Sequence, residues 1–246
     1  MGRWRRLMGM KQILVMMVAV VVLGCSKDTP EPSQAADAEA VLVNIADPTL
    51  EKAVRHILSK PEGELNGADF EKVTDLKLDG TQITNEGLKE VAKLQNLTVL
   101  SLNRTQITDA GLKEVAKLQQ LKLLRLRYTK ITDAGLKEVA KLQNLKDLYL
   151  SSTQITDAGL KELAKLQQLQ LLGLPTQITD AGFKELAKFQ KLAVLDLTGT
   201  KITDAGLKDV TKLQKLMGLF LYRTQVTEAG VAELKKALPN LAIYGP

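Results

Sequence analysis

The chain has few of the residues on which most catalytic and metal sites depend. Its 246 residues include one Cys, one His and one Trp. A single Cys excludes a disulfide framework and a thiolate zinc site. A single His excludes a multi-histidine metal site and leaves little for acid–base chemistry. We therefore expect neither enzymatic activity nor a metal or other cofactor.

Aromatic residues are also scarce, at 4% of the chain, whereas hydrophobic residues make up 45%, so the core must be aliphatic. This apolar content excludes a disordered chain. The formal net charge is +6, but four basic residues lie within the first 24 positions. Without them the chain carries 30 basic and 28 acidic residues. That balance gives no electrostatic reason to expect a nucleic-acid partner.

The first 24 residues have the pattern of an export signal. Basic residues lie within residues 1–11, and residues 13–23 form an uninterrupted run of 11 apolar residues. A basic segment, a short apolar segment and a small residue are the parts of a secretory signal peptide. The run is shorter than the roughly 20 residues of a membrane-spanning helix. An uncleaved anchor helix is the alternative interpretation.

The end of this run, Val22-Leu23-Gly24-Cys25, resembles the bacterial lipobox. The resemblance implies that the signal is cut after residue 24 and that Cys25, the only cysteine, carries lipid. Ser26 after the cysteine implies the outer membrane if the organism has two membranes. We expect an exported protein that touches the membrane through its lipid anchor only, because several acyl chains anchor a protein stably.

The residues that follow are predicted to form a tether. Residues 25–40 are rich in Pro, Ser, Ala and acidic residues, and they lack large apolar side chains. Such a composition cannot bury a core and is typical of a flexible linker. We divide the chain into the signal (1–24), the lipidated cysteine and tether (25–40), an N-terminal cap (41–72), and repeats with a short C-terminal cap (73–246).

The remainder of the chain is a tandem repeat. The sequence ITDAG occurs at 107–111, 131–135, 155–159, 178–182 and 202–206, flanked by the variants ITNEG at 83–87 and VTEAG at 226–230. A threonine precedes each of these segments at a spacing of 24 residues, with one step of 23. A fixed period of this length predicts a solenoid, in which each unit buries its apolar face against its neighbours.

Each unit combines a short strand with a helix. Leu97, Leu100 and Leu102 have the spacing of a strand that buries one face. Leu112 and Val115 place apolar groups on one face of the helix that follows. Either the Thr or the Asp of ITDAG can cap this helix. We also expect an ion pair four residues apart between each such Asp and the following Lys, as for Asp109 and Lys113.

This pattern resembles the leucine-rich repeat, in the bacterial form with ITDAGL turns. The resemblance implies an α/β fold, a right-handed horseshoe-shaped solenoid with parallel strands on the concave face and helices on the convex face. Two features depart from the family. Thr replaces the usual Asn after each strand, as at Thr81 and Thr105, and the fifth unit is one residue short and contains Pro175.

The segment before the repeats resembles the N-terminal cap of internalin-type proteins. The resemblance rests on Asp47-Pro48-Thr49-Leu50, Ala53-Val54-Arg55, Leu58, Lys60-Pro61-Glu62-Gly63 and Asp69-Phe70. A cap is physically necessary, because the first unit would otherwise expose its leucines. At the other end, residues 231–243 predict a last helix and strand. His56 is interpreted as an ordinary helix residue of the cap.

Positions that differ between units are where binding specificity can lie. The variable positions of the LxxLxLxxT strand segment should point to the concave face or its rim. They contain all four tyrosines and four of the five arginines that follow the signal. Tyr and Arg are enriched in binding hot spots, although strands favour Tyr in any case. The predicted binding residues are Arg104, Arg125, Arg127, Tyr128, Tyr149, Asp196, Phe220, Tyr222 and Arg223.

The predicted face has two parts. Arg104, Arg125 and Arg127 with the first two tyrosines form a basic aromatic patch, suited to a carboxylate, a phosphate or an acidic peptide. A second group lies near the C-terminal end and consists of Phe220, Tyr222 and Arg223, with Asp196 beside them. Gly173 and Pro175 lie between the two groups and have no bulky side chain. This gap is interpreted either as a notch that admits a protruding group of a ligand or as a tolerated one-residue deletion.

These features favour a monomeric, non-catalytic scaffold at the cell envelope that binds a protein or an acidic peptide. Two alternatives stay open at this point. The arginines could recognise an acidic polysaccharide or lipid head groups, in which case binding would fall steeply with salt. The protein could also be a structural spacer whose concave face binds nothing.

Overall fold

A computed structural model describes residues 42–246. The export signal, Cys25 and the tether therefore lie outside the described residues. Within the described part, no helix combines the length and the apolar character needed to cross a bilayer.

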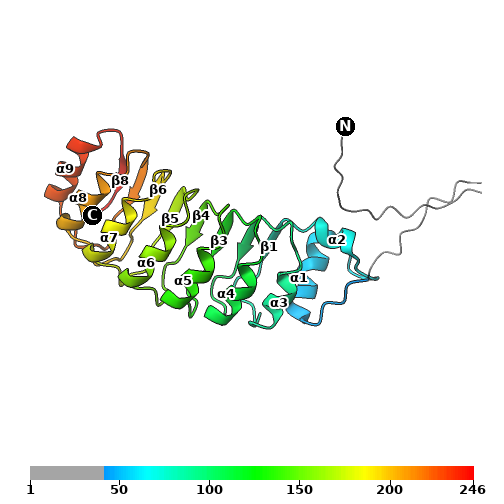
Figure 1. The fold of residues 1–246 in the computed structure, drawn as a ribbon. Helices are drawn as coiled ribbons and strands as arrows, with labels where there is room; N and C mark the ends of the chain where they lie inside the picture. Colours follow the sequence, from blue (N-terminus) through cyan, green and yellow to red (C-terminus); the bar gives the residue numbers. More distant parts are fainter. Residues whose placement is uncertain (1–41) are drawn as a thin grey trace, which may run out of the picture. The chain divides into compact units, whose positions relative to one another are not determined.

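The strands of residues 42–246 form one parallel sheet in which neighbours in sequence are neighbours in space (Figure 1). Each strand has three residues, and each pairs in register with the next. They are β1 (Asp75–Lys77), β2 (Val99–Ser101), β3 (Leu123–Arg125), β4 (Asp147–Tyr149), β5 (Leu171–Gly173), β6 (Val194–Asp196), β7 (Gly218–Phe220) and β8 (Ala242–Tyr244).

The helices of the repeats form a second layer beside the sheet, each packed against the next (Figure 1). Two helices precede the first strand: α1 (Pro48–Leu58) and α2 (Gly67–Glu71). The repeat helices are α3 (Gly87–Val91), α4 (Asp109–Val115), α5 (Asp133–Val139), α6 (Asp157–Leu163), α7 (Asp180–Leu186), α8 (Asp204–Val210) and α9 (Glu228–Ala237). The predicted α/β repeat solenoid is confirmed.

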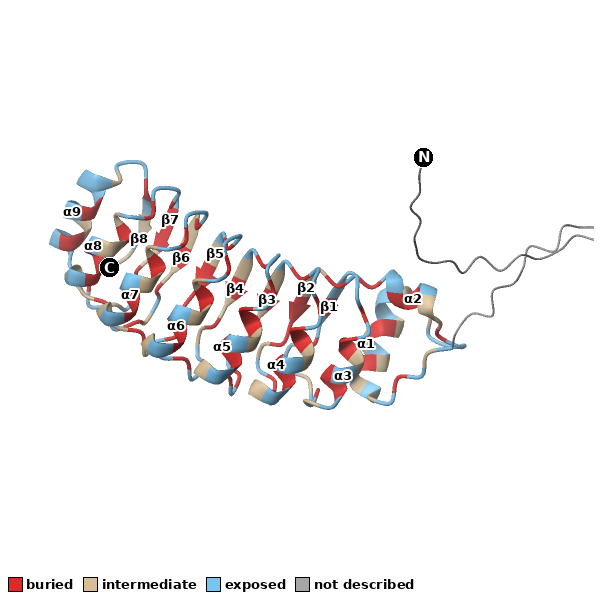
Figure 2. Cartoon of the chain, viewed as in Figure 1, coloured by how far each residue is buried: buried red, intermediate tan, exposed pale blue. Residues whose placement is uncertain are grey.

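The core lies between these two layers, and Figure 2 shows buried residues on both the strands and the helices. Its side chains are mainly aliphatic, with a few buried phenylalanines. The middle residue of strands β1 to β7 is a leucine that pairs with the equivalent leucine of the next strand, as Leu124 does with Leu148. Both are 0% exposed. Leu112 and Val115 of α4 close the column from the helix side, each 1% exposed. The expected aliphatic core and helix face are confirmed.

The Asp and Thr of ITDAG have separate functions, which the sequence alone left undecided. Thr179 caps α7, since its hydroxyl accepts a hydrogen bond from the Ala181 N–H at 3.2 Å. Asp157 instead reaches from its own repeat to the next. Its Oδ1 accepts from the Thr179 N–H at 3.0 Å, and its Oδ2 accepts from the Thr179 hydroxyl at 2.6 Å.

The same contact joins four further pairs of neighbouring repeats, which makes a ladder of Asp–Thr hydrogen bonds along the array. The other pairs are Asp109–Thr132, Asp133–Thr156, Asp180–Thr203 and Asp204–Thr227.

The glycine of ITDAG makes room for this ladder. A Cβ atom on Gly182 would lie 2.5 Å from Oδ1 of Asp157 and 2.9 Å from Cδ1 of Leu160. Both distances are far below ordinary van der Waals contact. The Asp of one repeat thus requires the Gly of the next, which explains why the two residues recur together.

The expected ion pair between Asp109 and Lys113 is not formed. The Asp109 carboxylate is occupied by Thr132, whose N–H and hydroxyl donate to it at 2.9 and 2.6 Å. The ion pair of this repeat joins Glu114 of α4 and Lys117 just after the helix, three residues apart at 2.6 Å. The expectation rested on the four-residue spacing alone, whereas the Asp109 carboxylate accepts hydrogen bonds from the next repeat instead.

In the N-terminal segment, residues on which the resemblance to a cap rests make local hydrogen bonds. Asp47 caps α1, with Oδ1 accepting from the Thr49 and Leu50 N–H groups at 2.9 and 3.0 Å. Lys60 donates to Oδ2 of Asp69 at 2.9 Å. This hydrogen bond is the main reason that the pKa of Asp69 is lowered.

Candidate binding face

The sheet register sorts the variable strand residues into rows. The third residue of each strand points away from the leucine core, because side chains alternate along a strand. These residues form the central row: Lys77, Ser101, Arg125, Tyr149, Gly173, Asp196, Phe220 and Tyr244. Four predicted binding residues, from Arg125 to Phe220, lie in it.

Three other predicted residues lie on a tight turn after the strand, here called the rim turn. Arg104, Tyr128 and Arg223 each precede a repeat threonine and have positive φ angles of 55°, 57° and 57°. The equivalent residues of other repeats, Gly80, Ser152 and Gly199, adopt the same conformation. Left-handed backbone is unfavourable for residues other than glycine. Arginine and tyrosine therefore occupy turns at which glycine is the less strained residue.

The rim turn is closed by the repeat threonine. The Thr129 hydroxyl donates to the Leu126 carbonyl at 2.6 Å, and other repeats make the same bond. The repeat with β5 lacks this turn, because one residue is missing and Pro175 precedes Thr176. Proline cannot adopt a positive φ. Thr176 is consequently exposed, whereas the equivalent Thr129 is buried.

The arginines and tyrosines contact one another. The Arg104 guanidinium lies 5.2 Å from the centre of the Tyr128 ring. Tyr149 receives two such groups, with Arg125 at 5.5 Å and Arg127 at 4.6 Å. Cations at these distances from an aromatic ring are attracted to its face. The predicted basic aromatic patch therefore exists as a set of touching side chains.

One loose ion pair joins the two predicted parts of the face. Arg127 extends from the end of β3 to β6, where its Nη2 atom lies 3.8 Å from Oδ2 of Asp196. Strands β4 and β5 lie between these positions in the sheet. Gly173 and Pro175 are both buried. The notch and the tolerated deletion at this position both stay predictions.

Polar bonds support the backbone below this patch. Oδ1 of Asp79 accepts from the Ser101 hydroxyl at 2.6 Å and from the Asn103 N–H at 2.8 Å. Oδ1 of Asn103 accepts from the Arg127 N–H at 2.9 Å. The backbone from which Arg127 extends is therefore held by a side-chain network.

Sequence reasoning did not single out Asp147, which begins β4 beside the patch. It pairs with Leu123 and Leu171 of the adjoining strands, so a carboxylate interrupts a mainly apolar row. Burial raises the pKa of Asp147, and the charges of Arg125 and Lys146 partly oppose the shift. Comparison of this strand position among units could have identified the residue.

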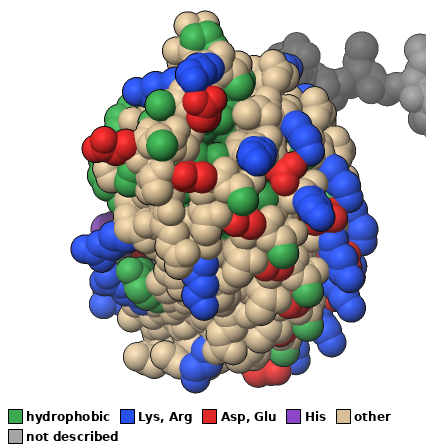
Figure 3. All heavy atoms as spheres, turned by 90° about the vertical axis from the view of Figure 1, so that its left-hand side faces the viewer, with side chains coloured by type: hydrophobic (Ala, Val, Ile, Leu, Met, Phe, Trp, Pro, Cys, Tyr) green, Lys and Arg blue, Asp and Glu red, His purple; other side chains and the backbone are tan. Residues whose placement is uncertain are grey.

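The C-terminal part of the face is aromatic. The Phe220 and Tyr244 rings stack with centroids 4.7 Å apart and an interplanar angle of 13°. Tyr222 on the following turn is 49% exposed. At the end of the array, Val231, Leu238 and Ile243 are only partly buried against the core. Figure 3 looks onto this end and shows hydrophobic side chains at its surface.

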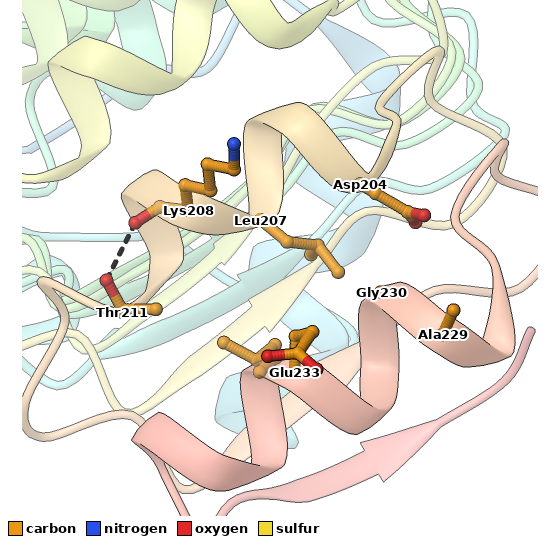
Figure 4. A pocket seen from close by; sticks show the side chains of 8 residues that line it. Asp204, Leu207, Lys208, Thr211, Ala229, Gly230 and Glu233 are labelled. Carbon is orange, nitrogen blue, oxygen red and sulfur yellow. Dashed lines mark hydrogen bonds between the residues drawn. The ribbon is translucent and has the colours of Figure 1, made fainter.

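A hollow lies between α8 and α9, outside the binding face (Figure 4). It is lined by Leu207, Leu234 and Gly230, with Asp204 and Glu233 nearby. Residues 42–246 contain no group of three His, Cys, Asp or Glu side chains arranged to hold a metal ion.

The fold and its repeats define an α/β repeat solenoid. The family model for the leucine-rich repeat region matches residues 65–241. The chain therefore belongs to the leucine-rich repeat family.

Two solved structures resemble the chain. Internalin C2 from Listeria monocytogenes is 30% identical with a TM-score of 0.59, over 80% of this chain and 92% of that one. A leucine-rich repeat protein of Leptospira interrogans is 22% identical with a TM-score of 0.51, over 72% of this chain and 50% of that one. The second likeness concerns the fold alone. A comparison with curated proteins gave no match.

Proposed function

We propose that the protein is a non-catalytic scaffold at the cell envelope that binds another protein through its strand face. The observation that carries the proposal is the placement of the large side chains of Arg104, Tyr128 and Arg223 in left-handed turns, where other repeats have the small residues Gly80, Ser152 and Gly199. Strained backbone of this kind costs stability and clusters at functional sites. In a spacer without a ligand, this loss of stability would have no compensating function.

The side chains at these positions suit protein recognition. Tyr and Arg dominate interface hot spots because each combines a large contact surface with directional hydrogen bonds. Tyr128 is 56% exposed and Tyr222 is 49% exposed. Preorganised strands and turns also reduce the conformational entropy lost on binding. The face is therefore suited to a macromolecular partner.

An affinity-capture experiment with envelope extract tests this function. The bait is the full chain, compared with a face variant (Arg125→Ala, Arg127→Ala and Tyr149→Ala) and a helix variant (Lys113→Ala and Lys137→Ala). We expect one protein to be retained by the native chain and the helix variant and lost by the face variant. Equal retention by all three baits would contradict the proposal.

The envelope location is proposed from the lipobox resemblance alone, and Cys25 carries it. A Cys25→Ser chain should lose both its labelling by fatty acid and its partition into membranes. A Ser26→Ala chain is the matched control and should keep both. If the Cys25→Ser chain still labels and partitions like the native protein, the lipid anchor is not there.

A further inference from the structure

The arginines of the binding face have more hydrogen-bond donors than acceptors within reach. A guanidinium carries five N–H donors and no acceptor. Among the described residues, Arg127 has one carboxylate within 4.0 Å, and Arg104 and Arg125 have none. The Nε atom of Arg127 is buried without a hydrogen-bond partner. Donors that lack acceptors favour a ligand that brings carboxylates.

The single ion pair at this face is loose. Nη2 of Arg127 lies 3.8 Å from Oδ2 of Asp196, and the two side chains are 37% and 24% exposed. A charge-assisted hydrogen bond would bring the atoms to about 2.8 Å. The pair is therefore electrostatic without a hydrogen bond, and an incoming carboxylate can form the shorter contact that Asp196 does not.

The shape of the face favours an extended polypeptide. Four inter-strand steps of about 4.8 Å separate β2 from β6, a distance that about six extended residues span. The row beside the central row contains Val99, Leu123, Leu171 and Val194, all partly exposed, and is interrupted by Asp147 between the two leucines. A peptide can place acidic side chains on the arginines and apolar side chains on this row, whereas a phosphate group can use only the arginines.

We propose that the binding face receives an extended acidic polypeptide segment, one carboxylate of which replaces Asp196 as the partner of Arg127. This inference rests on the proposed function, because it names the class of partner that the same face would bind. Arg104 and Arg125 then accept further carboxylates of the segment, and Tyr149 holds two guanidinium groups in place through its ring face.

Fluorescence anisotropy of labelled peptides with the full chain tests the class of ligand. The probes are hexaglutamate and hexaglutamine, with sodium tripolyphosphate and phosphatidylglycerol vesicles as competitors. We expect hexaglutamate to bind at least about tenfold more tightly than hexaglutamine, because only it supplies charge-assisted pairs. Equal binding of the two peptides overturns the acidic class. The second contrary result is that tripolyphosphate or vesicles displace the labelled hexaglutamate at a lower concentration of anionic groups than unlabelled hexaglutamate requires. That result overturns the acidic class in favour of a phosphate ligand.

Two single variants test the exchange of partners. Arg127→Ala should weaken hexaglutamate binding by about tenfold, as expected for the loss of a charge-assisted contact. Asp196→Asn should tighten it by about threefold, because the competing carboxylate is gone. If Asp196→Asn weakens binding as Arg127→Ala does, Asp196 positions the arginine for the ligand and the exchange is wrong. Lys113→Ala on α4 is the matched control and should change nothing.

Failure of this inference is distinguishable from failure of the proposed function. If the envelope partner is captured through the face and hexaglutamate binds no better than hexaglutamine, the acidic class is wrong and the scaffold function stands. If hexaglutamate competes with the captured partner and the Arg127→Ala chain loses both, the inference and the function agree.

Discussion

The two sides of each repeat obey different rules. The ITDAG turn and its helix recur almost unchanged, and the structure accounts for three residues of the turn: Thr179 caps, Asp157 bridges and Gly182 leaves room. The strand face varies from repeat to repeat, and three of its residues, Arg104, Tyr128 and Arg223, occupy left-handed turns that cost stability. The difference indicates that the residues repeated in every unit are those that the fold requires. The variable residues of the strand face need an explanation other than folding.

The largest expected effect separates two adjacent residues of β4. Leu148→Ala removes a fully buried side chain and should lower the free energy of unfolding by about 2–5 kcal/mol. Tyr149→Ala lies on the opposite side of the strand and should cost about 1 kcal/mol or less. Denaturant unfolding of both variants checks the contrast. Equal losses would mean that the strand face also supports the fold.

A smaller loss is expected where a side chain is added at the repeated glycine. Gly182→Ala should cost about 1–3 kcal/mol, because its Cβ overlaps Asp157 and Leu160. Gly173→Ala on the strand face should be tolerated, since the nearest atom to its Cβ would be Tyr149 Cδ1 at 3.6 Å. A double-mutant cycle supplies the control, because the Gly182→Ala penalty should shrink in an Asp157→Ala chain. An unchanged penalty would remove Asp157 as its cause.

Substitutions at the rim turn should change the free energy of unfolding in the opposite direction, because here glycine is the more stable residue. Tyr128→Gly should raise the free energy of unfolding by about 1 kcal/mol, because it relieves a left-handed tyrosine. Gly199→Ala should lower it by a similar amount. Thermal or denaturant unfolding measures both. A loss of stability in the Tyr128→Gly chain would show that tyrosine supports the turn and is not strained there.

The smallest effects concern pH, and the two sides should again differ. Hydrogen bonds from the Thr227 N–H and hydroxyl lower the pKa of Asp204, so its stabilisation is present above the unfolded pKa of about 4 and is lost as the pH falls through its lower folded value. The raised pKa of Asp147 has the reverse consequence: its ionised form destabilises the fold near neutral pH, and acid relieves this penalty.

The pH effects are checked by unfolding the two Asn variants at several pH values. Asp204→Asn should therefore destabilise the chain at neutral pH and Asp147→Asn should stabilise it, with both differences fading towards pH 3. A destabilised Asp147→Asn chain at neutral pH would mean that Arg125 outweighs the burial of that carboxylate.

Sequence reasoning reached the fold because the repeat period, the leucine spacing and the helix pattern all describe local structure. It could not decide between Thr and Asp as the cap, since the partner of Asp157 lies 22 residues away in the next repeat. The expected pair of Asp109 and Lys113 was wrong for the same reason, because a bond between repeats took the carboxylate.

The candidate face was predictable as a set of positions but not as a set of contacts. The strand register follows from the period, so Arg125 and Tyr149 could be placed side by side. The reach of Arg127 to Asp196 depends on its rotamer, which no periodic pattern specifies. The left-handed conformation of Arg104 and Tyr128 was also missed, although glycine at the same position in other repeats was an available signal.

The most direct test of this division combines stability and binding in one chain. The variant carries Arg104→Gly, Tyr128→Gly and Arg223→Gly, and its unfolding and its capture of the envelope partner are measured on the same preparation. The account predicts a chain that unfolds at higher denaturant than the native protein and no longer retains the partner. A less stable chain, or one that retains the partner fully, would contradict the claim that these residues serve binding at the expense of the fold.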